Sequence, residues 1–188
     1  MKTLNATHYE SIPTYPSKDE RRRGAVHGII ETPQGSTYKY ALDNEHGIIA
    51  LKAVLPEGYR WPFDYGFIPQ TLGDDGDPLD LLMLLADGTF SGCMVKARIL
   101  GAIRLSKNGV ENDRFIGAPV PMPGRTLFTD EYETLSDLPQ NLRRQIEDFL
   151  CGYSEGEGNK IELHPAVESS EARELVEHSR KAFRKKAA

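Results

Sequence analysis

The chain has 188 residues, of which 39% are hydrophobic and 27% are charged, and its formal net charge is −5. This length fits one domain, and the composition excludes a disordered or fibrous protein. The negative charge excludes a general attraction to nucleic acid or anionic membranes, so an anionic ligand needs local basic residues or metal ions. Residues 1–23 are polar and carry a mixed-charge run that begins at Lys18. We expect them to form an arm against a single domain spanning residues 24–188.

From residue 25 the pattern changes to short apolar segments between turn signals, which predicts strands over Ala25–Glu31, Thr37–Asp43 and Ile48–Leu55. Residues 44–47 join the second and third as a hairpin loop that ends in a permissive Gly. Further strands are predicted at Leu81–Leu85, which is apolar throughout, at Val95–Ile99, which alternates apolar and basic residues, and at Arg114–Pro119. Asn108-Gly109 supplies a tight hairpin before the last strand.

Helical spacing appears only late in the chain. The first apolar stripe follows a capping-box-like start at Asp137-Leu138-Pro139-Gln140, and it comprises Leu138, Leu142, Ile146, Phe149 and Leu150. The second stripe comprises Ala172, Leu175, Val176, Ser179 and Phe183. The basic residues from Arg180 to Lys186 are interpreted as a solvated helix end rather than a ligand site. Strands followed by helices predict an α+β fold, a β-barrel with peripheral helices.

The two cysteines, Cys93 and Cys151, are far apart and outside any Cys-x-x-Cys spacing. That arrangement argues against a disulfide framework and against a zinc knuckle, and it favours a reducing compartment. No stretch has the apolar length of a membrane span or of a secretory signal. We therefore expect a cytoplasmic protein that binds neither nucleic acid nor membranes.

Four carboxylates fall within seven residues in one segment: Asp74, Asp75, Asp77 and Asp80. Such a cluster repels itself unless cations lie among its members, and Mg²⁺ prefers these hard oxygen ligands. Gly76 and Pro78 shape the loop, and the apolar segment after Asp80 anchors it. An ordinary solvated turn is the alternative, because Asp, Gly and Pro all favour turns. An EF-hand loop is disfavoured, because its twelfth position requires Glu and is Ala86 here.

The motif Asp75-x-Asp77-Pro78-x-Asp80 resembles the signature of the family I soluble inorganic pyrophosphatases. Three upstream segments resemble the same family in the same order: Glu31-Thr32-Pro33, the run from Tyr38 to Asp43, and the run from Trp61 to Pro69. The resemblance implies a five-stranded OB-like closed β-barrel with additional strands and two peripheral C-terminal helices. It also implies pyrophosphate as the substrate, Mg²⁺ or Mn²⁺ as the cofactor, and a homo-oligomer.

The resemblance also implies a role for each matching residue. Catalysis falls to Asp77 and Tyr65, metal binding to Asp75, Asp80, Asp77 and Glu31, and substrate binding to Lys39, Arg114 and Tyr153. Lys107 does not match the family pattern, and we expect it to bind substrate because its positive charge can take the place of a metal ion. In this scheme Asp77 accepts the proton of the attacking water, and a carboxylate beside a water that bridges two divalent cations suits that task. Without the motif, the tyrosines fit a core aromatic role equally well, and Lys39 or Arg114 fits a solvated strand position.

The sequence departs from the family pattern at positions that the family uses for metal or phosphate, which are Ala41, Ala53, Lys107, Asn112 and Ser154. Trp61 keeps the ring of a family tyrosine and loses its hydroxyl. We therefore expect Asp75 and Asp80 to hold one or two Mg²⁺ ions, Lys107 to replace a metal, and turnover to be slower than is standard for the family.

The leading hypothesis is an enzyme that hydrolyses pyrophosphate to two phosphates by direct attack of a metal-activated water. A hydrolase of another diphosphate is the first alternative, because the residues lost at Ala41, Ala53 and Ser154 would have enforced a small, highly charged substrate. A non-catalytic protein that binds metal or phosphate is the second alternative. Asp77 argues against the second, because a binding protein has no need of a proton acceptor there.

Overall fold

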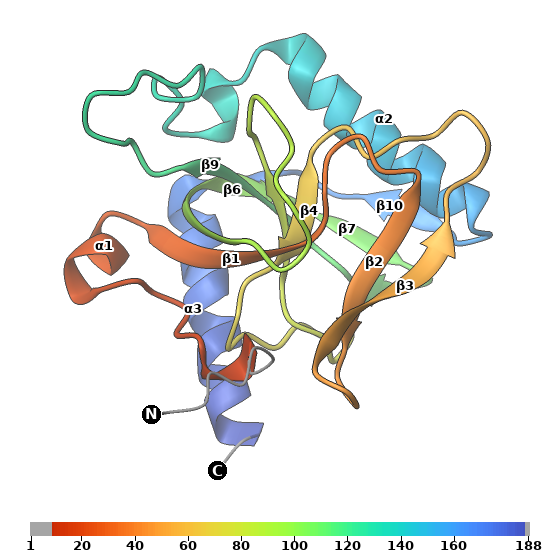
Figure 1. Ribbon diagram of the computed structural model, residues 1–188, viewed down its shortest axis with the longest axis horizontal. Coiled ribbons are helices and arrows are strands. Elements are labelled where there is room, and N and C mark those ends of the chain that lie inside the picture. The colour runs from red at the N-terminus through yellow and green to blue at the C-terminus, as the bar shows by residue number, and fades with distance from the viewer. Residues whose placement is uncertain (1–8, 187–188) are drawn as a thin grey trace.

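The computed structural model describes residues 9–186. Five strands close into a barrel (Figure 1), in the order β1 (Ala25–Thr32), β4 (Asp64–Phe67), β5 (Asp80–Met83), β9 (Arg114–Pro119) and β6 (Met94–Ile103). A second pairing of β1 with β6 completes the closure. Strands β5 and β9 run parallel, and the other barrel pairs are antiparallel. The predicted OB-like α+β barrel is confirmed.

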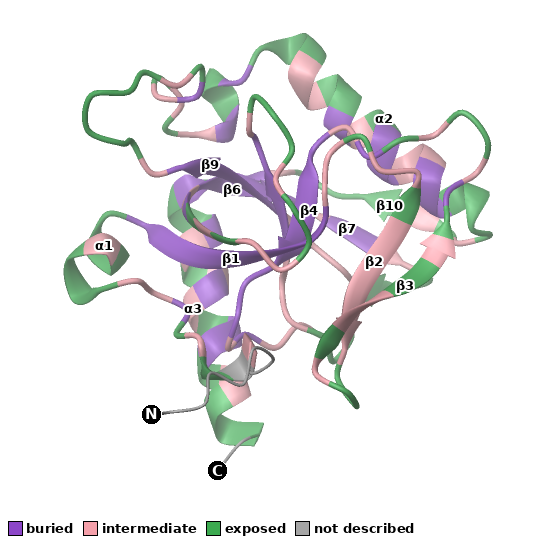
Figure 2. Ribbon diagram, in the orientation of Figure 1, coloured by how far each residue is buried: buried purple, intermediate pink, exposed green. Residues whose placement is uncertain are grey.

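Strands β1, β4, β5 and β9 are buried at nearly every position (Figure 2), whereas β6 begins with the exposed residues Met94 and Lys96 and is buried mainly in its second half. Strand β5 shows burial on both faces. Leu81 and Met83 pack into one apolar cluster, whereas Leu82 and the following Leu84 pack into a second cluster on the other face. Helix α2 covers the second cluster and helix α3 covers the first. The prediction of a doubly buried strand here is confirmed.

Further strands extend the barrel. Strands β2 (Tyr38–Asp43) and β3 (Ile48–Val54) form a hairpin that carries no fully buried residue (Figure 2). A small sheet contains β10 (Ile161–Leu163), β7 (Leu105–Lys107) and β8 (Val110–Glu111), and β11 (Val167–Glu168) adds to the edge of β6. The turn between β7 and β8 is the predicted Asn108-Gly109 hairpin, and both residues have positive φ, as a type I′ turn requires.

Two long helices lie outside the barrel on different sides of it (Figure 1), α2 (Gln140–Gly156) and α3 (Ser169–Lys186). Helix α2 starts later than its apolar stripe suggests. Leu138 precedes it, and the capping box belongs to the short 3₁₀ helix η2 (Leu135–Asp137), in which Asp137 pairs with Thr134. Pro139 occupies the N-cap position of α2 without a side-chain capping hydrogen bond, and as a proline it has no N–H that the helix would leave unpaired. Between residues 9 and 186, no helix is long and apolar enough to cross a membrane.

Residues 1–8 of the predicted arm lie outside the described residues. The rest of it forms a 3₁₀ helix, η1 (Tyr9–Ser11), and a short helix, α1 (Lys18–Arg22), between which Thr14 is buried. The Thr14 hydroxyl donates to the carbonyl of Pro69 over 2.9 Å. This part of the arm therefore packs against the barrel, while the division of the chain at residue 24 stays a prediction.

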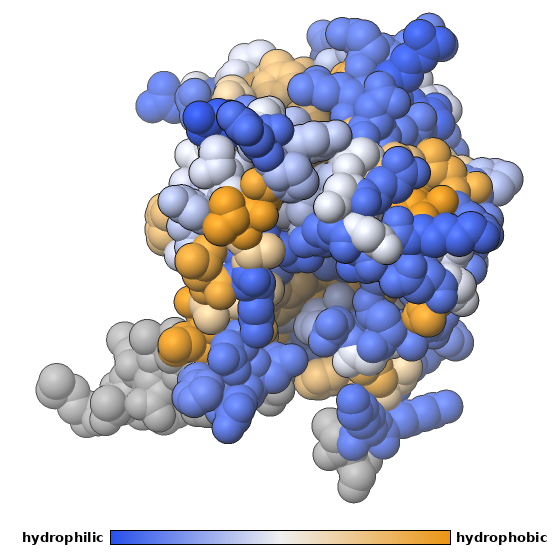
Figure 3. Space-filling view, turned by 90° about the vertical axis from the view of Figure 1, so that its right-hand side faces the viewer, coloured by the Kyte–Doolittle hydropathy of each residue, from blue (hydrophilic) through white to orange (hydrophobic). Residues whose placement is uncertain are grey.

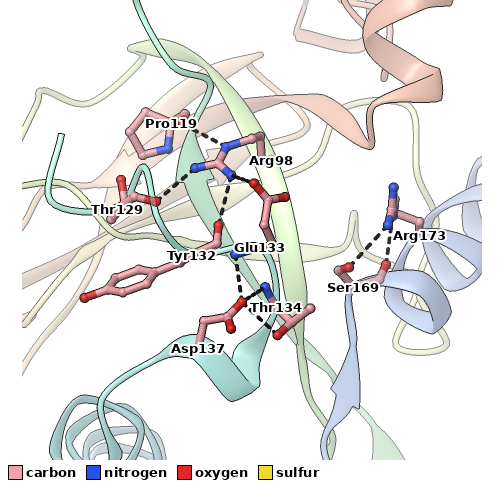
Figure 4. A network of polar contacts seen from close by, with 9 residues as sticks. All are labelled: Arg98, Pro119, Thr129, Tyr132, Glu133, Thr134, Asp137, Ser169 and Arg173. Carbon is pink, nitrogen blue, oxygen red and sulfur yellow. Dashed lines mark hydrogen bonds and ion pairs between the residues drawn. The ribbon is translucent and has the colours of Figure 1, made fainter. Parts of the chain in front are cut away.

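Arg98 of β6 holds the long segment that connects β9 to η2 (Figure 4). Its guanidinium donates to the carbonyls of Pro119, Thr129 and Tyr132, at 3.4, 2.9 and 2.9 Å. Asp137 closes the end of the same segment, because its carboxylate accepts from the backbone N–H of Thr134 over 2.7 Å. These contacts from one partly buried arginine fix a loop that has little regular structure of its own.

Candidate active site

A cavity of about 560 Å³ lies between the β2–β3 hairpin and one end of the barrel. The side of the molecule that carries β2 and β3 is largely hydrophilic and is hollowed near its centre (Figure 3). Five acidic and three basic side chains line the cavity: Glu31, Asp74, Asp75, Asp77, Asp80, Lys39, Lys107 and Arg114. Tyr65 also lines it, so the structure brings together every predicted site residue except Tyr153.

Strand register explains how distant residues meet here. Strands β5 and β9 are parallel and begin at Asp80 and Arg114, which are paired in register. Adjacent positions on parallel strands bring their side chains to one end of the barrel. On β1, a shift of register beside Glu31 marks an irregularity where the strand reaches the cavity. The acidic loop enters the same end of the barrel, because it leads directly into β5.

Arg114 connects two of the carboxylates. Its Nη1 lies 2.5 Å from Oδ2 of Asp80 and donates to the carbonyl of Asn112 over 2.7 Å. Its Nη2 donates to the side-chain oxygen of Asn112, whose amide nitrogen donates to Asp75. Burial works against the charge of Arg114, but Asp80 and neighbouring acidic groups outweigh burial and raise its pKa. The result is a continuous polar chain from Asp80 to Asp75.

The carboxyl groups of the cavity differ in their tendency to hold a proton. Burial, followed by repulsion from Asp75 and Asp80, raises the pKa of Asp77. Burial raises the pKa of Glu31 to about 8, although its Oε1 accepts from the backbone N–H of Leu42 over 2.6 Å. A carboxylate with a raised pKa is a stronger base once it is ionised, and this is the property that proton abstraction requires.

Lys39 and Tyr65 line the cavity, and Tyr153 lies behind them. Burial lowers the pKa of Lys39, and its ammonium lies 5.4 Å from the ring centre of Tyr153. Tyr153 donates to Glu157 over 2.8 Å and packs in an aromatic cluster, tilted against Trp61 and stacked on Phe149, so it belongs to the core beside the cavity rather than to its lining. Burial raises the pKa of the Tyr65 hydroxyl well above its ordinary value.

Of the positions that depart from the family pattern, Ala41, Lys107 and Asn112 line the cavity, whereas Ala53 and Ser154 do not. Sequence reasoning treated Asn112 only as a lost ligand and missed its position between Arg114 and Asp75. It also missed Arg104, which contacts Asp113 at 3.0 Å. Arg104 precedes the β7–β8 hairpin in the sequence and Asp113 follows it, and this pairing of opposite charges could have predicted the contact between them.

The acidic residues of the cavity suit a hard divalent cation, because they offer only oxygen ligands. Four of the five carboxylates come from the segment Asp74–Asp80. In the part of the chain that the structure describes, no three acidic, histidine or cysteine side chains converge closely enough to hold a metal ion. Arg114 contacts Asp80 and Asn112 donates to Asp75 through one oxygen, Oδ2, of each carboxylate. A carboxylate has two oxygens with several acceptor sites, so these contacts are compatible with a bound cation.

Comparisons with known proteins agree with one another. A family model described as inorganic pyrophosphatase matches residues 28–184. An inorganic pyrophosphatase of Haloferax volcanii is 32% identical over 172 residues, covering 91% of this chain and 93% of the relative. One from Geobacillus stearothermophilus is 37% identical over 138 residues, covering 73% and 81%. The crystal structure of the Thermus thermophilus inorganic pyrophosphatase superposes with a TM-score of 0.83 at 28% identity, covering 94% of this chain and 98% of the other.

Proposed function

The chain belongs to the inorganic pyrophosphatase family, and from that premise we propose that the described cavity is the place where it hydrolyses pyrophosphate to two phosphates. The observation that carries the proposal is the meeting of Asp77 with the basic residues Lys39, Lys107 and Arg114 in one cavity. This arrangement supplies a proton acceptor beside groups that bind phosphate oxygens, which direct water attack on a diphosphate needs.

In the proposed reaction, the oxygen of a water molecule bonds to one phosphorus atom, and the bond from that phosphorus to the bridging oxygen breaks. The second phosphate leaves with the bonding electron pair, and Asp77 accepts the proton of the water. Lys39, Lys107 and Arg114 hold phosphate oxygens, and the guanidinium of Arg114 suits this task because it presents several donors in a fixed plane. The hydroxyl of Tyr65 is held protonated by burial and orients a phosphate oxygen or the water as a donor.

The family implies a divalent metal cofactor, and we propose Mg²⁺, with Mn²⁺ as a substitute. Asp75, Asp77 and Asp80 would hold the ions, and Glu31 would hold an outer ion through water. Once bound, such ions neutralise phosphate charge and lower the pKa of a bound water. Asn112 and Lys107 offer no carboxylate to an outer ion, which supports weaker metal binding and slower turnover than is standard for the family.

Phosphate release from pyrophosphate across a Mg²⁺ titration tests the proposal. We expect saturable activation by the metal, and we expect Asp77→Asn to lower kcat by at least about 100-fold, the contribution typical of a positioned base. Asp87→Asn is the matched control, because Asp87 is exposed and does not line the cavity. The absence of pyrophosphate hydrolysis at every Mg²⁺ and Mn²⁺ concentration would overturn the proposal.

We also propose that the protein is cytoplasmic and forms homo-oligomers. Both cysteines are free, with Cys93 and Cys151 each half-buried, which suits a reducing compartment. Several large apolar side chains of the described surface are more than two-fifths exposed, among them Leu51, Val54 and Phe90. Sedimentation of the purified protein measures its mass directly, and a monomer at micromolar concentration would contradict the oligomer.

A further inference from the structure

A second cavity of about 350 Å³ adjoins the catalytic one. It lies where the acidic loop, the N-terminal arm and the end of helix α3 meet. Its lining is mostly apolar and includes three aromatic side chains, Tyr9, Phe67 and Phe183. The rings of Tyr9 and Phe67 stand edge to face, with centroids 6.1 Å apart. A volume in this range suits a small organic group, whereas aromatic side chains offer no hydrogen bonds or positive charge to a phosphate group.

The two cavities share part of their walls. Leu42, Asn44, Phe67 and Pro78 line both. Gly76 of the acidic loop lines the second cavity, and a Cβ atom built there would meet nothing within 4 Å. A ligand with its phosphates among the catalytic carboxylates and basic residues can therefore extend past Pro78 into the second cavity.

A cation lines the second cavity. Lys186, near the end of α3, is exposed and contributes to the lining of that cavity. The neighbouring Lys185 is also exposed and lines neither cavity. The helix end predicted to be solvated thus brings one of its basic residues to the second cavity.

We propose that the second cavity is a subsite for the flat heteroaromatic group of a nucleoside diphosphate, whose two phosphates occupy the catalytic cavity. Aromatic walls bind such a group by stacking, and Asn44 supplies an amide that can pair with its polar edge. Lys186 supplies positive charge where the phosphates approach. This inference rests on the proposed function, because it uses the same catalytic residues and extends their substrate class.

The reaction that follows is hydrolysis of the terminal phosphate. The water oxygen bonds to the terminal phosphorus, and the bond from that phosphorus to the bridging oxygen breaks. The nucleoside monophosphate leaves with the electron pair on that oxygen, and the proton of the water goes to Asp77. Adenosine diphosphate and methyl diphosphate carry the same reacting groups, so a difference between them measures the contribution of the nucleoside.

The test compares kcat/KM for adenosine diphosphate, methyl diphosphate and pyrophosphate with Mg²⁺ present. We expect kcat/KM for adenosine diphosphate to exceed that for methyl diphosphate by about tenfold or more, the effect of about one stacking contact. Phe183→Ala should remove most of this preference, and Phe183→Leu, which keeps the apolar volume, should reduce it. Phe128→Ala is the matched control, because Phe128 is 51% exposed and lines no part of either cavity.

Lys186 gives an independent arm of the test. Lys186→Gln should raise KM for adenosine diphosphate several-fold, and Lys185→Gln should leave it unchanged. Equal kcat/KM for adenosine diphosphate and methyl diphosphate in the wild-type protein would overturn the subsite while pyrophosphate hydrolysis stands. Calorimetric binding of adenosine diphosphate that depends on Phe183, without any pyrophosphate hydrolysis, would support the subsite and refute the proposed function. If Phe183→Ala changes only the oligomeric mass, a second copy covers the cavity and the subsite is refuted.

Discussion

At the scale of single residues, the basic groups of the site are already engaged with its carboxylates. Arg114 contacts Asp80 directly and reaches Asp75 through Asn112. A buried charge that loses its partner is costly, so these contacts keep the acidic loop in place in the absence of a ligand. They also mean that a phosphate group that binds Arg114 competes with interactions inside the protein.

The shape of the Arg114 guanidinium, which contacts Asp80 and Asn112 at once, is therefore expected to contribute to activity in addition to its charge. Arg114→Lys keeps the charge but cannot contact Asp80 and Asn112 in the same geometry. We expect kcat/KM for pyrophosphate to fall by about 10- to 100-fold, as loss of one to two charge-assisted hydrogen bonds would produce. Steady-state kinetics measure this, with Arg144→Lys on the exposed side of α2 as control. Wild-type kinetics in Arg114→Lys would show that Arg114 acts only as a point charge.

Glu31 gives a prediction about pH. Its folded-state pKa of about 8 lies above the ordinary value of 4.5, so between these values the folded protein keeps a proton that the unfolded chain releases. The carboxyl group therefore destabilises the fold increasingly as pH rises from about 4.5 to about 8. In a metal chelator, Glu31→Gln should gain stability relative to wild type across this window.

Urea unfolding at several pH values measures that gain, which should exceed about 1.4 kcal/mol, the equivalent of one pKa unit. The glutamine side chain keeps an oxygen that can accept from the N–H of Leu42, so the comparison isolates the charge. A stability difference between Glu31→Gln and wild type that stays constant from pH 4.5 to pH 8 would contradict an elevated pKa.

At the scale of elements, the barrel depends on close contact between β1 and β4. Gly66 of β4 lies against the backbone of β1, and a Cβ built on it would lie 1.8 Å from the carbonyl oxygen of Ile29. No side-chain rotation relieves a contact with backbone, so the strands would have to separate. Since β4 also pairs with β5, which carries Asp80, the packing of this glycine positions the site.

Gly66→Ala should therefore destabilise the protein by more than about 4 kcal/mol, an exceptional cost for one methyl group. Gly35→Ala is the comparison, because that glycine has φ +82° and a Cβ there would meet nothing within 4 Å. Its cost should be limited to left-handed strain, about 1–2 kcal/mol. Urea or thermal unfolding compares them, and equal costs would mean that β1 and β4 can move apart freely.

The sequence predicts the strands that local pattern defines and misses those that tertiary pairing creates. The apolar run after Asp80 and the Asn108-Gly109 turn are local signals, and both predictions are confirmed. Strand β4 is missed because prolines bound it, and β10 and β11 are missed because two or three residues carry no periodicity. Strand β6 runs past Ile99 to Ile103 through a shift of register at Gly101, which no alternation pattern reveals.

The site residues follow the same rule, because those defined by a local pattern are predictable from the sequence and those brought together by tertiary pairing are not. The acidic loop is contiguous in the sequence, and its cluster of carboxylates is visible there. The chain of contacts from Arg114 through Asn112 to Asp75 joins segments 37 residues apart, and it depends on the parallel register of β5 and β9. Likewise, Lys186 comes to line the second cavity because α3 packs along the barrel, and its sequence context shows only a basic helix end.

At the scale of the whole molecule, the N-terminal arm is bound to the C-terminal helix α3 by polar contacts. Tyr15 and Arg21 belong to the N-terminal arm, and Glu177 and Arg180 belong to α3. Glu177 accepts from Tyr15 over 2.9 Å, contacts Arg21 at 3.1 Å, and pairs with Arg180 at 2.6 Å. One carboxylate thus links the arm to α3, and residues of both segments line the second cavity. The ionisation of Glu177 should therefore determine how strongly the arm is held against α3.

The hydrogen bonds from Arg180, and then from Tyr15, lower the pKa of Glu177 to about 2, below the ordinary 4.5. A depressed folded-state pKa stabilises the fold above about pH 4.5, and this stabilisation is lost as pH falls toward about 2.

Glu177→Gln should therefore cost about 1–3 kcal/mol at pH 7, which lowers Tm by about 2–10 °C. Thermal unfolding from pH 7 to pH 2 should show the two proteins converging at the acid end, whereas Glu174→Gln, exposed on the same helix, should follow wild type throughout. Because Tyr9 belongs to the same arm as Tyr15 and Arg21, and Phe183 belongs to α3, loss of the Glu177 contacts should also weaken binding of adenosine diphosphate more than binding of pyrophosphate. A stability difference that persists unchanged at pH 2 would show that the arm is held by packing rather than by this charge.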